Sequence, residues 1–312
     1  MSVRKIFRLR LAKRTLVLGN KTLVMGVLNI TPDSFSDGGK FFSPQQAIQQ
    51  ALALEKAGAD ILDIGAESTR PGSSEISVVE ELRRLLPVLQ ALRGRIKIPI
   101  SIDTRKSSVA EITLGAGAEM INDVSALRYD PRIADVVADK KCGLILMHMR
   151  GEPATMQTAS FAKNVVQDVT KGLRASLAVA LKAGVAKSQI VLDPGIGFGK
   201  SFSQNYELLR KLPEIAKLGY PLAVGTSRKG FLGHTLALAK EGAFNEGARY
   251  SASSSKKLAT LRSKKPVRSE ERLFATAATV AASILGGAHI VRVHDVAEMA
   301  QVAAVTDRIL DS

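Results

Sequence analysis

The stretch PQQAIQQALALEKAGADILDIGAES, residues 44–68, contains one repeat of the pattern that decides the fold. Apolar residues recur every three or four positions over Pro44–Ala57, which is the period of a helix with one buried face. Gly58 stands where such a helix should end, and the apolar run Asp60–Ile64 has the composition of a buried parallel strand. This stretch therefore predicts a helix that leads into a strand of a parallel sheet.

The same alternation of helical and strand-like stretches extends over most of the chain. Further helical patterns cover Val78–Leu92 and Ser107–Leu114, and Gly115, Gly219 and Gly287 again stand between a helix and a strand. Eight βα units in sequence predict a (β/α)₈ TIM barrel, with a doubly wound sheet as the alternative. The expected strands are Thr22–Leu28, Asp60–Ile64, Ile98–Ile102, Glu119–Ile121, Gly143–Met147, Gln189–Leu192, Pro221–Val224 and Ala288–Val293.

Two segments depart from this alternation. In residues 1–21, apolar residues alternate with arginines over Phe7–Leu11, so we expect an N-terminal antiparallel hairpin that covers the bottom of the barrel. Residues 240–272 are rich in Ser, Lys and Gly, which is typical of a mobile basic insertion, here in the seventh βα loop between the strand and its helix. We expect residues 1–312 to form a single barrel domain.

The chain has 44 Lys and Arg against 29 Asp and Glu, a net charge of +15, which raises the question of a nucleic-acid partner. Most of this excess lies in residues 1–21 and 240–272, outside the expected barrel. Aromatic residues make up only 4% of the chain and are not interleaved with the basic ones. We therefore expect no nucleic-acid partner.

The remaining bulk features indicate a soluble cytoplasmic protein. The lone cysteine, Cys142, excludes an intrachain disulfide and is interpreted as a core residue. The basic start of the chain lacks the continuous apolar stretch of a secretory signal. The weakly polar run Ala275–Val291 is too short for a membrane span and is interrupted by two glycines, so no membrane association is expected.

Polar side chains stand at the carboxyl end of every expected strand. In a barrel of parallel strands these ends form the active face. A single residue of this kind is more often a helix N-cap or a satisfied polar group, but capping does not explain all eight strands. We therefore expect the set to converge on one site. Its members are Asn29, Asp63, Asp103, Asn122, Asp123, His148, Asp193, Ser227, Arg228, Lys229, Arg292 and His294.

Seven segments resemble, in the expected order, the successive signatures of the dihydropteroate synthase family. The first two are long and specific, whereas short ones such as SIDTRK or RVHD are weak alone. The segments are MGVLNITPDSFSDGG (Met25–Gly39), DIGAESTRPGS (Asp63–Ser73), SIDTRK (Ser101–Lys106), INDVSAL (Ile121–Leu127), LDPGIGFGK (Leu192–Lys200), GTSRKGFLG (Gly225–Gly233) and RVHD (Arg292–Asp295).

The resemblance implies a transferase of folate biosynthesis. Such an enzyme condenses 6-hydroxymethyl-7,8-dihydropterin diphosphate with 4-aminobenzoate and gives 7,8-dihydropteroate and diphosphate. The resemblance also implies the barrel fold, a homodimer, Mg²⁺ as a cofactor, and inhibition by sulfonamides that mimic 4-aminobenzoate.

A pterin ring presents an amino group beside a ring N–H, and a carboxylate accepts this donor pair in bidentate fashion. Asp193 is the candidate acceptor, as the resemblance also implies. Asp103 and Asn122 would form hydrogen bonds with the remaining polar positions on the edge of the ring. Lys229 would donate to the ring carbonyl and nitrogen. The apolar members would form the walls of the slot, although ordinary core packing explains them equally well. The expected pterin site comprises Asp103, Asn122, Met147, Asp193, Phe198 and Lys229.

The diphosphate leaving group requires positive donors and a metal. Arg292 and His294 share one strand face, so both are expected to point at the same anion. Arg70 offers a planar fork that clamps phosphates from a loop. In the family an oxygen of the residue that corresponds to Asn29 ligates the bridging Mg²⁺. Arg70, Arg292 and His294, together with Lys229, are the expected catalytic residues.

The second substrate is an arylamine that is neutral at pH 7, so we expect neither a strong general base nor a covalent enzyme intermediate. Metal and arginine stabilise the departing diphosphate, and closing loops exclude water from the cation that remains. By resemblance, the 4-aminobenzoate pocket is lined by Phe35, Thr69, Pro71 and Ser227.

Two alternatives share the expected slot. A methyltransferase that passes a methyl group from a folate to a corrinoid protein has no diphosphate to release, and the Arg292/His294 pair favours the synthase. A catalytically silent homologue would not be expected to retain every strand-end residue and both long loop motifs.

Overall fold

The computed structural model describes residues 4–31, 44–68, 73–152, 156, 161–240 and 267–311. Within these ranges, eight parallel strands form one sheet in the order β8-β7-β6-β5-β4-β3-β10-β9. A parallel bridge between Leu192 and Leu222 joins its two edges, so the sheet closes into a barrel. The strands are β3 (Leu23–Asn29), β4 (Ile61–Gly65), β5 (Ile100–Asp103), β6 (Met120–Asp123), β7 (Gly143–Met147), β8 (Ile190–Asp193), β9 (Ala223–Val224) and β10 (Ile290–Val293).

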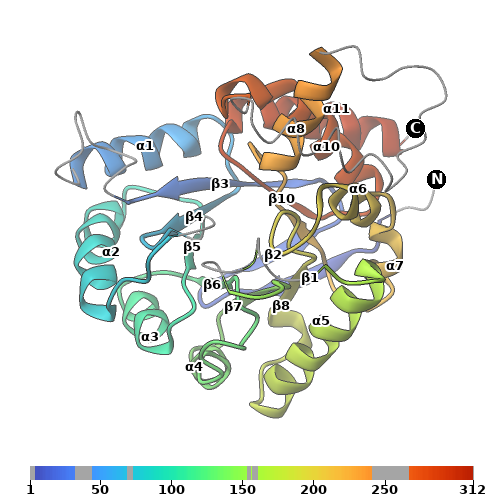
Figure 1. The fold of residues 1–312 in the computed structure, drawn as a ribbon. Helices are drawn as coiled ribbons and strands as arrows, with labels where there is room; N and C mark the ends of the chain where they lie inside the picture. Colours follow the sequence, from blue (N-terminus) through green and yellow to red (C-terminus); the bar gives the residue numbers. More distant parts are fainter. Residues whose placement is uncertain are drawn as a thin grey trace.

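Helices form a ring around these strands (Figure 1). The predicted TIM barrel is therefore confirmed, and the doubly wound alternative is wrong because a doubly wound sheet has two open edges, whereas here a bridge from β8 to the residue before β9 joins them. The described helices are α1 (Pro44–Lys56), α2 (Val78–Leu92), α3 (Ser107–Gly115), α4 (Ile133–Lys140), α5 (Val165–Lys182), α6 (Phe202–Arg210), α7 (Leu212–Ala216), α8 (Gly230–Lys240), α10 (Leu273–Leu285) and α11 (Val296–Asp311), with 3₁₀ turns at Lys187–Gln189 and Glu270–Arg272.

Several strands end later than the apolar pattern predicted. Asn29, Asp103, Asp123 and Asp193 are the last residues of their strands, whereas the prediction stopped each strand before its polar end. The reason is that backbone pairing continues through the polar residue; Asn29, for example, pairs with Gly65. The polar side chains are therefore held by the sheet itself and not by flexible loops.

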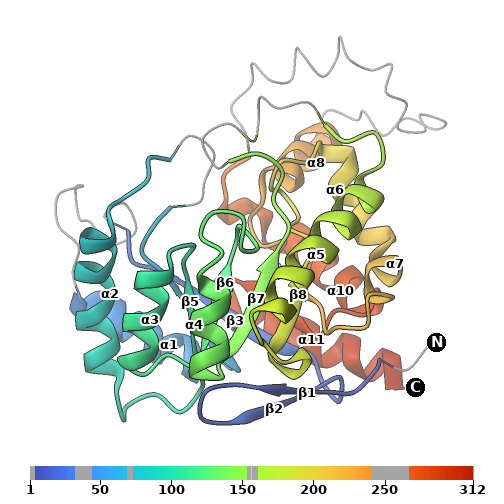
Figure 2. The same cartoon turned by 90° about the horizontal axis from the view of Figure 1, so that it is seen from below.

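The predicted N-terminal hairpin closes the bottom of the barrel. Strands β1 (Phe7–Arg10) and β2 (Thr15–Leu18) pair antiparallel and lie below the parallel strands (Figure 2). Leu9, Leu11 and Leu18 are buried in one apolar cluster with residues from seven of the barrel strands. A Cβ on Gly143 would lie only 2.6 Å from Cδ2 of Leu11, so glycine at this position lets the hairpin approach closely.

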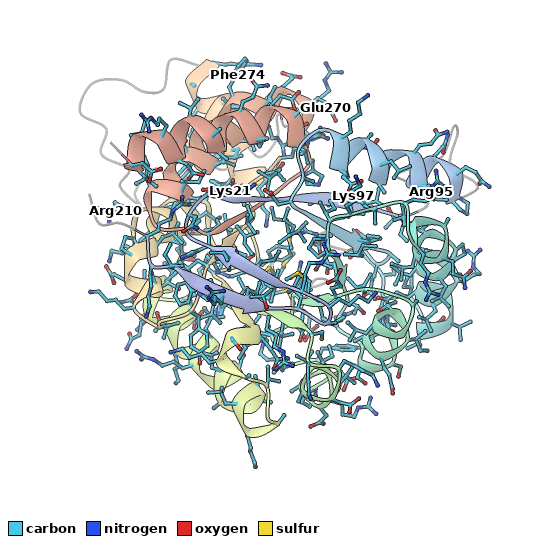
Figure 3. The ribbon with its side chains drawn as sticks, turned by 180° about the vertical axis from the view of Figure 1, so that it is seen from behind. Lys21, Arg95, Lys97, Arg210, Glu270 and Phe274 are labelled. Atoms are coloured by element: carbon cyan, nitrogen blue, oxygen red, sulfur yellow. The ribbon has the colours of Figure 1, made fainter. Side chains whose placement is uncertain are left out.

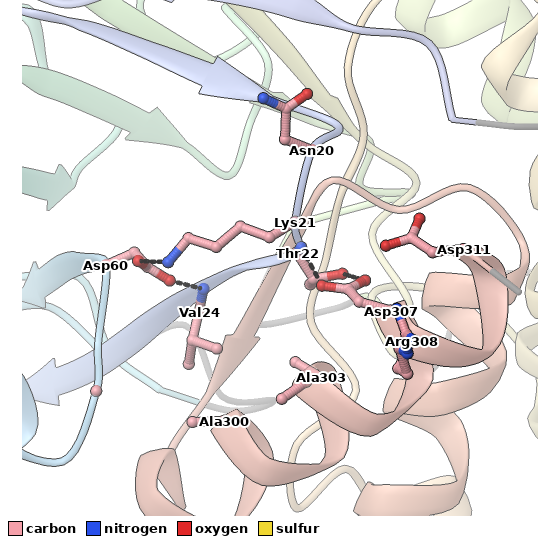
Figure 4. Close-up of a pocket in the computed structure, with 12 residues that line it drawn as sticks. Asn20, Lys21, Thr22, Val24, Asp60, Ala300, Ala303, Asp307, Arg308 and Asp311 are labelled. Carbon is pink, nitrogen blue, oxygen red and sulfur yellow. Dashed lines mark hydrogen bonds and ion pairs between the residues drawn. The ribbon is translucent and has the colours of Figure 1, made fainter.

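A buried ion pair between Arg4 and Asp307, together with the hydrogen bond from Thr22 to Asp307 in Figure 4, fastens α11 to the start of the barrel. Oδ2 of Asp307 accepts from the backbone N–H of Thr22 at 2.6 Å, and Oδ1 accepts from Arg4 at 2.5 Å. Asp60 accepts from Lys21 at 2.6 Å and from the N–H of Val24 at 2.9 Å. The pocket in Figure 4 is lined by Lys21, Asp60 and Asp307, and these polar side chains already have partners within the chain. No helix in the described part of the chain is long and apolar enough to cross a membrane.

The basic insertion lies in the seventh unit, but α8 separates it from the strand. Lys240 ends α8, and residues 241–266 lie outside the described residues. Of residues 267–272, which the sequence assigned to the insertion, Val267 and Arg272 pack on the barrel. Nη1 of Arg272 donates to the carbonyl oxygen of Arg228 at 2.7 Å, and Val267 is buried.

Candidate active site

The first group of predicted residues meets around Arg292 at the carboxyl-terminal mouth of the barrel. Nε of Arg292 donates to Oδ2 of Asp63 at 2.7 Å, and Nη2 donates to Oδ2 of Asp103 at 2.9 Å. Nδ2 of Asn122 donates to the same Asp63 oxygen at 3.0 Å. The structure therefore brings together the predicted Asp103, Asn122 and Arg292. It adds Asp63, which the sequence marked only as a strand end.

The carboxylates beside Arg292 are buried and incompletely paired. Burial raises the pKa of Asp103 to about 7, against the opposing effect of the Arg292 charge. Oδ1 of Asp63 is buried and accepts no hydrogen bond from a described residue. Because a buried acceptor without a donor costs about 1–3 kcal/mol, this corner of the mouth suits a ligand that brings N–H donors.

A second group meets around Asp193 at the end of β8. The backbone N–H of Gly195 donates to Oδ1 of Asp193 at 2.6 Å. Nζ of Lys229 donates to the carbonyl oxygen of Ile196 and lies 4.1 Å from the centre of the Phe198 ring. Burial raises the pKa of the Asp193 carboxyl and lowers the pKa of Lys229 to about 7, while their opposite charges counteract both shifts. Asp193, Phe198 and Lys229 thus form one unit.

The apolar side of the site is built from Met147 and Phe198. Met147 is buried in a small cluster with Val124, Met149 and Met156, and Phe198 packs against this cluster. Both residues are thus part of a packed apolar surface. This apolar surface also lies beside Lys229, because the ammonium group of Lys229 is placed over the Phe198 ring.

Ser227 and His294 are paired with one another. The backbone N–H of His294 donates to Oγ of Ser227 at 3.2 Å, and the ring Nδ1 lies 3.0 Å from the same oxygen. Burial, reinforced by the charges of Arg292 and Arg228, lowers the pKa of His294 to about 3. His294 is therefore neutral at pH 7, and it lies just beyond β10. In the structure Arg292 contacts two carboxylates and the neutral His294 contacts Ser227, and the expectation that both point at one anion stays a prediction.

Asn29 is the last residue of β3 and is partly exposed at the same mouth. Within the described ranges, no group of three or more His, Cys, Asp or Glu side chains is arranged to hold a metal ion. Magnesium keeps several waters in proteins and is often bound by one or two protein oxygens plus phosphate oxygens of the substrate. An amide oxygen at a strand end fits such a site.

Four predicted residues, Phe35, Thr69, Arg70 and Pro71, lie outside the described residues. The segment before residue 69 is held by a buried ion network that sequence reasoning missed. Lys106 donates to Glu67 and, at 2.7 Å, to Oε2 of Glu81, while Arg105 donates to Glu67 at 2.8 Å. The adjacent basic pair that follows β5 was the signal that could have revealed this network.

A model of the family described as pterin binding enzymes matches residues 25–294, which include every site residue described above. Fold and site thus define a pterin-binding barrel enzyme. A dihydropteroate synthase from Synechocystis is 45% identical over 93% of this chain and 91% of its own length.

Solved structures narrow the class further. The crystal structure of a dihydropteroate synthase from Clostridium difficile in the presence of pteroic acid is 41% identical, with a TM-score of 0.80, and the match covers 94% of this chain and 98% of that one. A dihydropteroate synthase from Yersinia pestis in complex with a sulfonamide drug has a TM-score of 0.84 at 35% identity, and the match covers 98% and 100% of the two chains. The chain belongs to the dihydropteroate synthase family.

Proposed function

We propose that this chain condenses 6-hydroxymethyl-7,8-dihydropterin diphosphate with 4-aminobenzoate to give 7,8-dihydropteroate and diphosphate. The observation that carries the proposal is the pair of buried carboxylates, Asp103 and Asp193, each flanked by a cation at the mouth of the barrel. Such acceptors suit a flat heterocycle with several N–H donors. Incubation of the purified protein with both substrates and Mg²⁺ should yield dihydropteroate and diphosphate in equal amounts. If no dihydropteroate forms, the proposal is rejected.

The pterin lies, in this proposal, between the two groups of residues. Asp193 accepts the amino and ring N–H pair through a carboxylate already oriented by the N–H of Gly195. Asp103 and Asn122 meet the other edge, where Asp63 retains an unpaired buried oxygen among the described residues. Lys229 donates to the ring carbonyl and nitrogen. Met147 and Phe198 form the apolar walls, consistent with their shared packing.

The diphosphate is bound by Asn29, Arg70, Arg292 and His294. Mg²⁺, held by Asn29 and the diphosphate oxygens, would neutralise charge that develops on the leaving group. Arg292 supplies the fixed positive charge near the reacting carbon. His294, being neutral, contributes a hydrogen bond in place of a charge. The amine nitrogen of 4-aminobenzoate forms the new C–N bond, the C–O bond to diphosphate breaks, and the amine proton passes to solvent.

The pocket for 4-aminobenzoate is formed by Phe35, Thr69, Pro71 and Ser227, and sulfonamides compete for it. The drug complex of the Yersinia pestis relative supports sulfonamide binding at the level of the family. We expect the protein to act in the cytoplasm.

The chain forms a homodimer through α10 and α11. These two helices pack on one another and present large apolar side chains outward. Phe274 of α10 is 85% exposed and points away from the barrel in Figure 3, and Val305 of α11 is 63% exposed. Because such side chains gain by burial against a second copy, Phe274→Asp with Val305→Asp should convert a dimer to a monomer in light scattering. A wild-type protein that remains monomeric at micromolar concentration would reject this part of the proposal.

A further inference from the structure

Lys200 is buried behind the predicted pterin site, and this burial lowers the pKa of its amino group well below the usual value. Only 6% of the residue is exposed. Nζ donates to the carbonyl oxygen of His148 at 2.8 Å and lies 3.0 Å from Nδ1 of the same residue. Burial of an amino group is costly. These two contacts offset part of that cost and hold the Lys200 side chain in one position.

His148 is a rigid partner for Lys200. Burial, reinforced by Lys200 and Arg128, lowers the pKa of His148 to about 2, so the ring is neutral at pH 7. Nδ1 lies within hydrogen-bond distance of Nζ of Lys200, and Nε2 faces Oδ2 of Asp168 at 3.7 Å. The ring also lies against Gly172 of α5, where a Cβ would come within 2.5 Å of Cδ2.

The contacts of His148 continue directly into the pterin side of the barrel. Its backbone N–H donates to the carbonyl oxygen of Asp193 at 2.9 Å. Gly195 has a φ of +66°, and a Cβ there would lie 1.8 Å from the carbonyl oxygen of His148. The N–H of the same Gly195 orients the Asp193 carboxylate. The backbone of Gly195, which orients the Asp193 carboxylate, thus packs directly on His148, the residue that Lys200 contacts.

The segment Asp193–Lys200 is held at both ends. It begins at Asp193 in β8 and ends at Lys200, whose side chain returns to His148 beside the start of the segment. Between these ends it carries Phe198 and the carbonyl oxygen of Ile196 that binds Lys229. Any shift of the segment would therefore move three members of the predicted pterin site together.

We propose that Lys200, held by His148, is a positioning residue that fixes the segment Asp193–Lys200 so that the Asp193 carboxylate and the Phe198 ring meet the pterin. Lys200 itself does not touch the substrate. The inference rests on the proposed role of Asp193 in pterin binding. It deepens that role by naming the internal contact that makes the carboxylate rigid before the pterin arrives.

Lys200→Met tests the proposal because methionine keeps a similar length without charge or donors. Calorimetric affinity for the pterin diphosphate, with Mg²⁺ and without 4-aminobenzoate, should fall about tenfold or more, as for the loss of one buried hydrogen bond. The Michaelis constant for 4-aminobenzoate at saturating pterin should change less than about twofold. Wild-type pterin affinity in folded Lys200→Met would overturn the proposal.

Arg4→Met is the matched control. It also removes a buried basic side chain with several hydrogen bonds, but at the opposite end of the barrel. It should lower the melting temperature without changing pterin affinity. If both variants lower the melting temperature and pterin affinity alike, Lys200 is merely structural and the proposal fails.

A pair of variants at His148 keeps the test decisive if Lys200→Met does not fold. Asn and Leu have nearly the same shape, but only Asn places an acceptor near the position of Nδ1. His148→Asn should bind the pterin diphosphate within about threefold of wild type, whereas His148→Leu should bind about tenfold more weakly. Equal affinities in the two variants would overturn the proposal.

Asp193→Asn separates the positioning role from the site assignment. If Lys200 acts through Asp193, Lys200→Met should weaken binding far less in the Asp193→Asn background than alone. Unchanged affinity in Asp193→Asn by itself would reject Asp193 as the pterin acceptor. Weak binding in Asp193→Asn with fully additive loss on adding Lys200→Met would reject only the positioning role.

Discussion

Nε of Arg292 lies 2.7 Å from Oδ2 of Asp63, although the two residues are 229 positions apart in the sequence. Closure of the barrel makes this contact, because β3 lies between β10 and β4 and pairs with both. The guanidinium is thereby positioned by a carboxylate that belongs to a barrel strand. The same contact leaves the other oxygen of Asp63 without a donor among the described residues.

Asp63→Ala should destabilise the protein, since it leaves Arg292 with one buried partner in place of two. We expect a loss of about 2–3 kcal/mol in the free energy of unfolding, below the value for a fully buried pair, since the Arg292 side chain is 22% exposed. Urea denaturation measures this loss. Arg292→Met added to Asp63→Ala should cost less than the two single losses combined, and strict additivity would contradict the pairing.

Asp193→Ala should weaken pterin binding more than it weakens the fold. A buried donor pair of the ligand loses its charged acceptor, which corresponds to about 2–3 kcal/mol of binding free energy. Calorimetry with the pterin diphosphate measures the effect. Asp60→Ala, which removes a carboxylate that pairs with Lys21 at the opposite end of the barrel, should leave the affinity within about twofold. An unchanged affinity in folded Asp193→Ala would refute the assignment.

The raised pKa of Asp103 predicts a pH dependence of stability. The pKa of Asp103 in the folded protein is about 7, whereas that of an ordinary aspartate is 3.8. The folded state therefore binds more protons between these values, and the contribution of Asp103 to stability is present at low pH and lost as pH rises through 7. Relative to wild type, Asp103→Asn should gain stability between pH 4 and 7 by up to about 2–4 kcal/mol. Denaturation curves at several pH values measure this gain, and a difference that stays constant with pH would show that Asp103 is ionised throughout.

The contact between Leu11 and Gly143 predicts a coupled pair of substitutions. Leu11→Ala should cost about 2–4 kcal/mol through the cavity it leaves. Gly143→Ala should also destabilise, because its Cβ would lie 2.6 Å from Leu11 and 2.9 Å from Cβ of Met120. The double variant should lose less stability than the sum of the two single losses, because the alanine at position 11 no longer meets the new Cβ at position 143. Thermal melts measure both, and folded variants should retain their pterin affinity because the hairpin lies at the opposite end.

Removal of Mg²⁺ should stop turnover without unfolding the protein. The described residues contain no carboxylate or histidine cluster that would make a metal part of the fold. EDTA should therefore abolish dihydropteroate formation and leave the melting temperature unchanged within error. Full turnover after exhaustive chelation would exclude the proposed metal. A melting temperature that falls on chelation would instead indicate a structural metal site.

Most of the barrel was predictable because its signals are local. Strand β7 and helix α2 have the bounds that the apolar pattern predicted. The carboxyl ends of β3, β5, β6 and β8 were missed by one or two residues, since a pattern of apolar residues stops where the polar site residue begins. The short β9, Ala223–Val224, was predicted too long, because Leu222 contributes a bridge to Leu192 instead of a regular strand residue.

The site was predictable as a list of residues and only partly as an arrangement. Position at a strand end identified Asp103, Asn122, Asp193, Lys229 and Arg292, and the barrel brings them to one mouth. The side-chain partners were not predictable. Arg292 and His294 share a short stretch of sequence, yet one is bound by carboxylates and the other by Ser227.

The sequence by itself determined the succession of βα units, the closed barrel and the polar residues that face its mouth, because periodicity and strand ends depend on residues close together in the chain. Only the tertiary structure decided which charges meet and which are neutral. Those outcomes depend on contacts across the barrel, such as Arg292 with Asp63, and on burial, which sets the pKa of Asp103, Lys229 and His294. The contact of Lys200 with His148 likewise exists only because the loop after β8 folds back onto the end of β7.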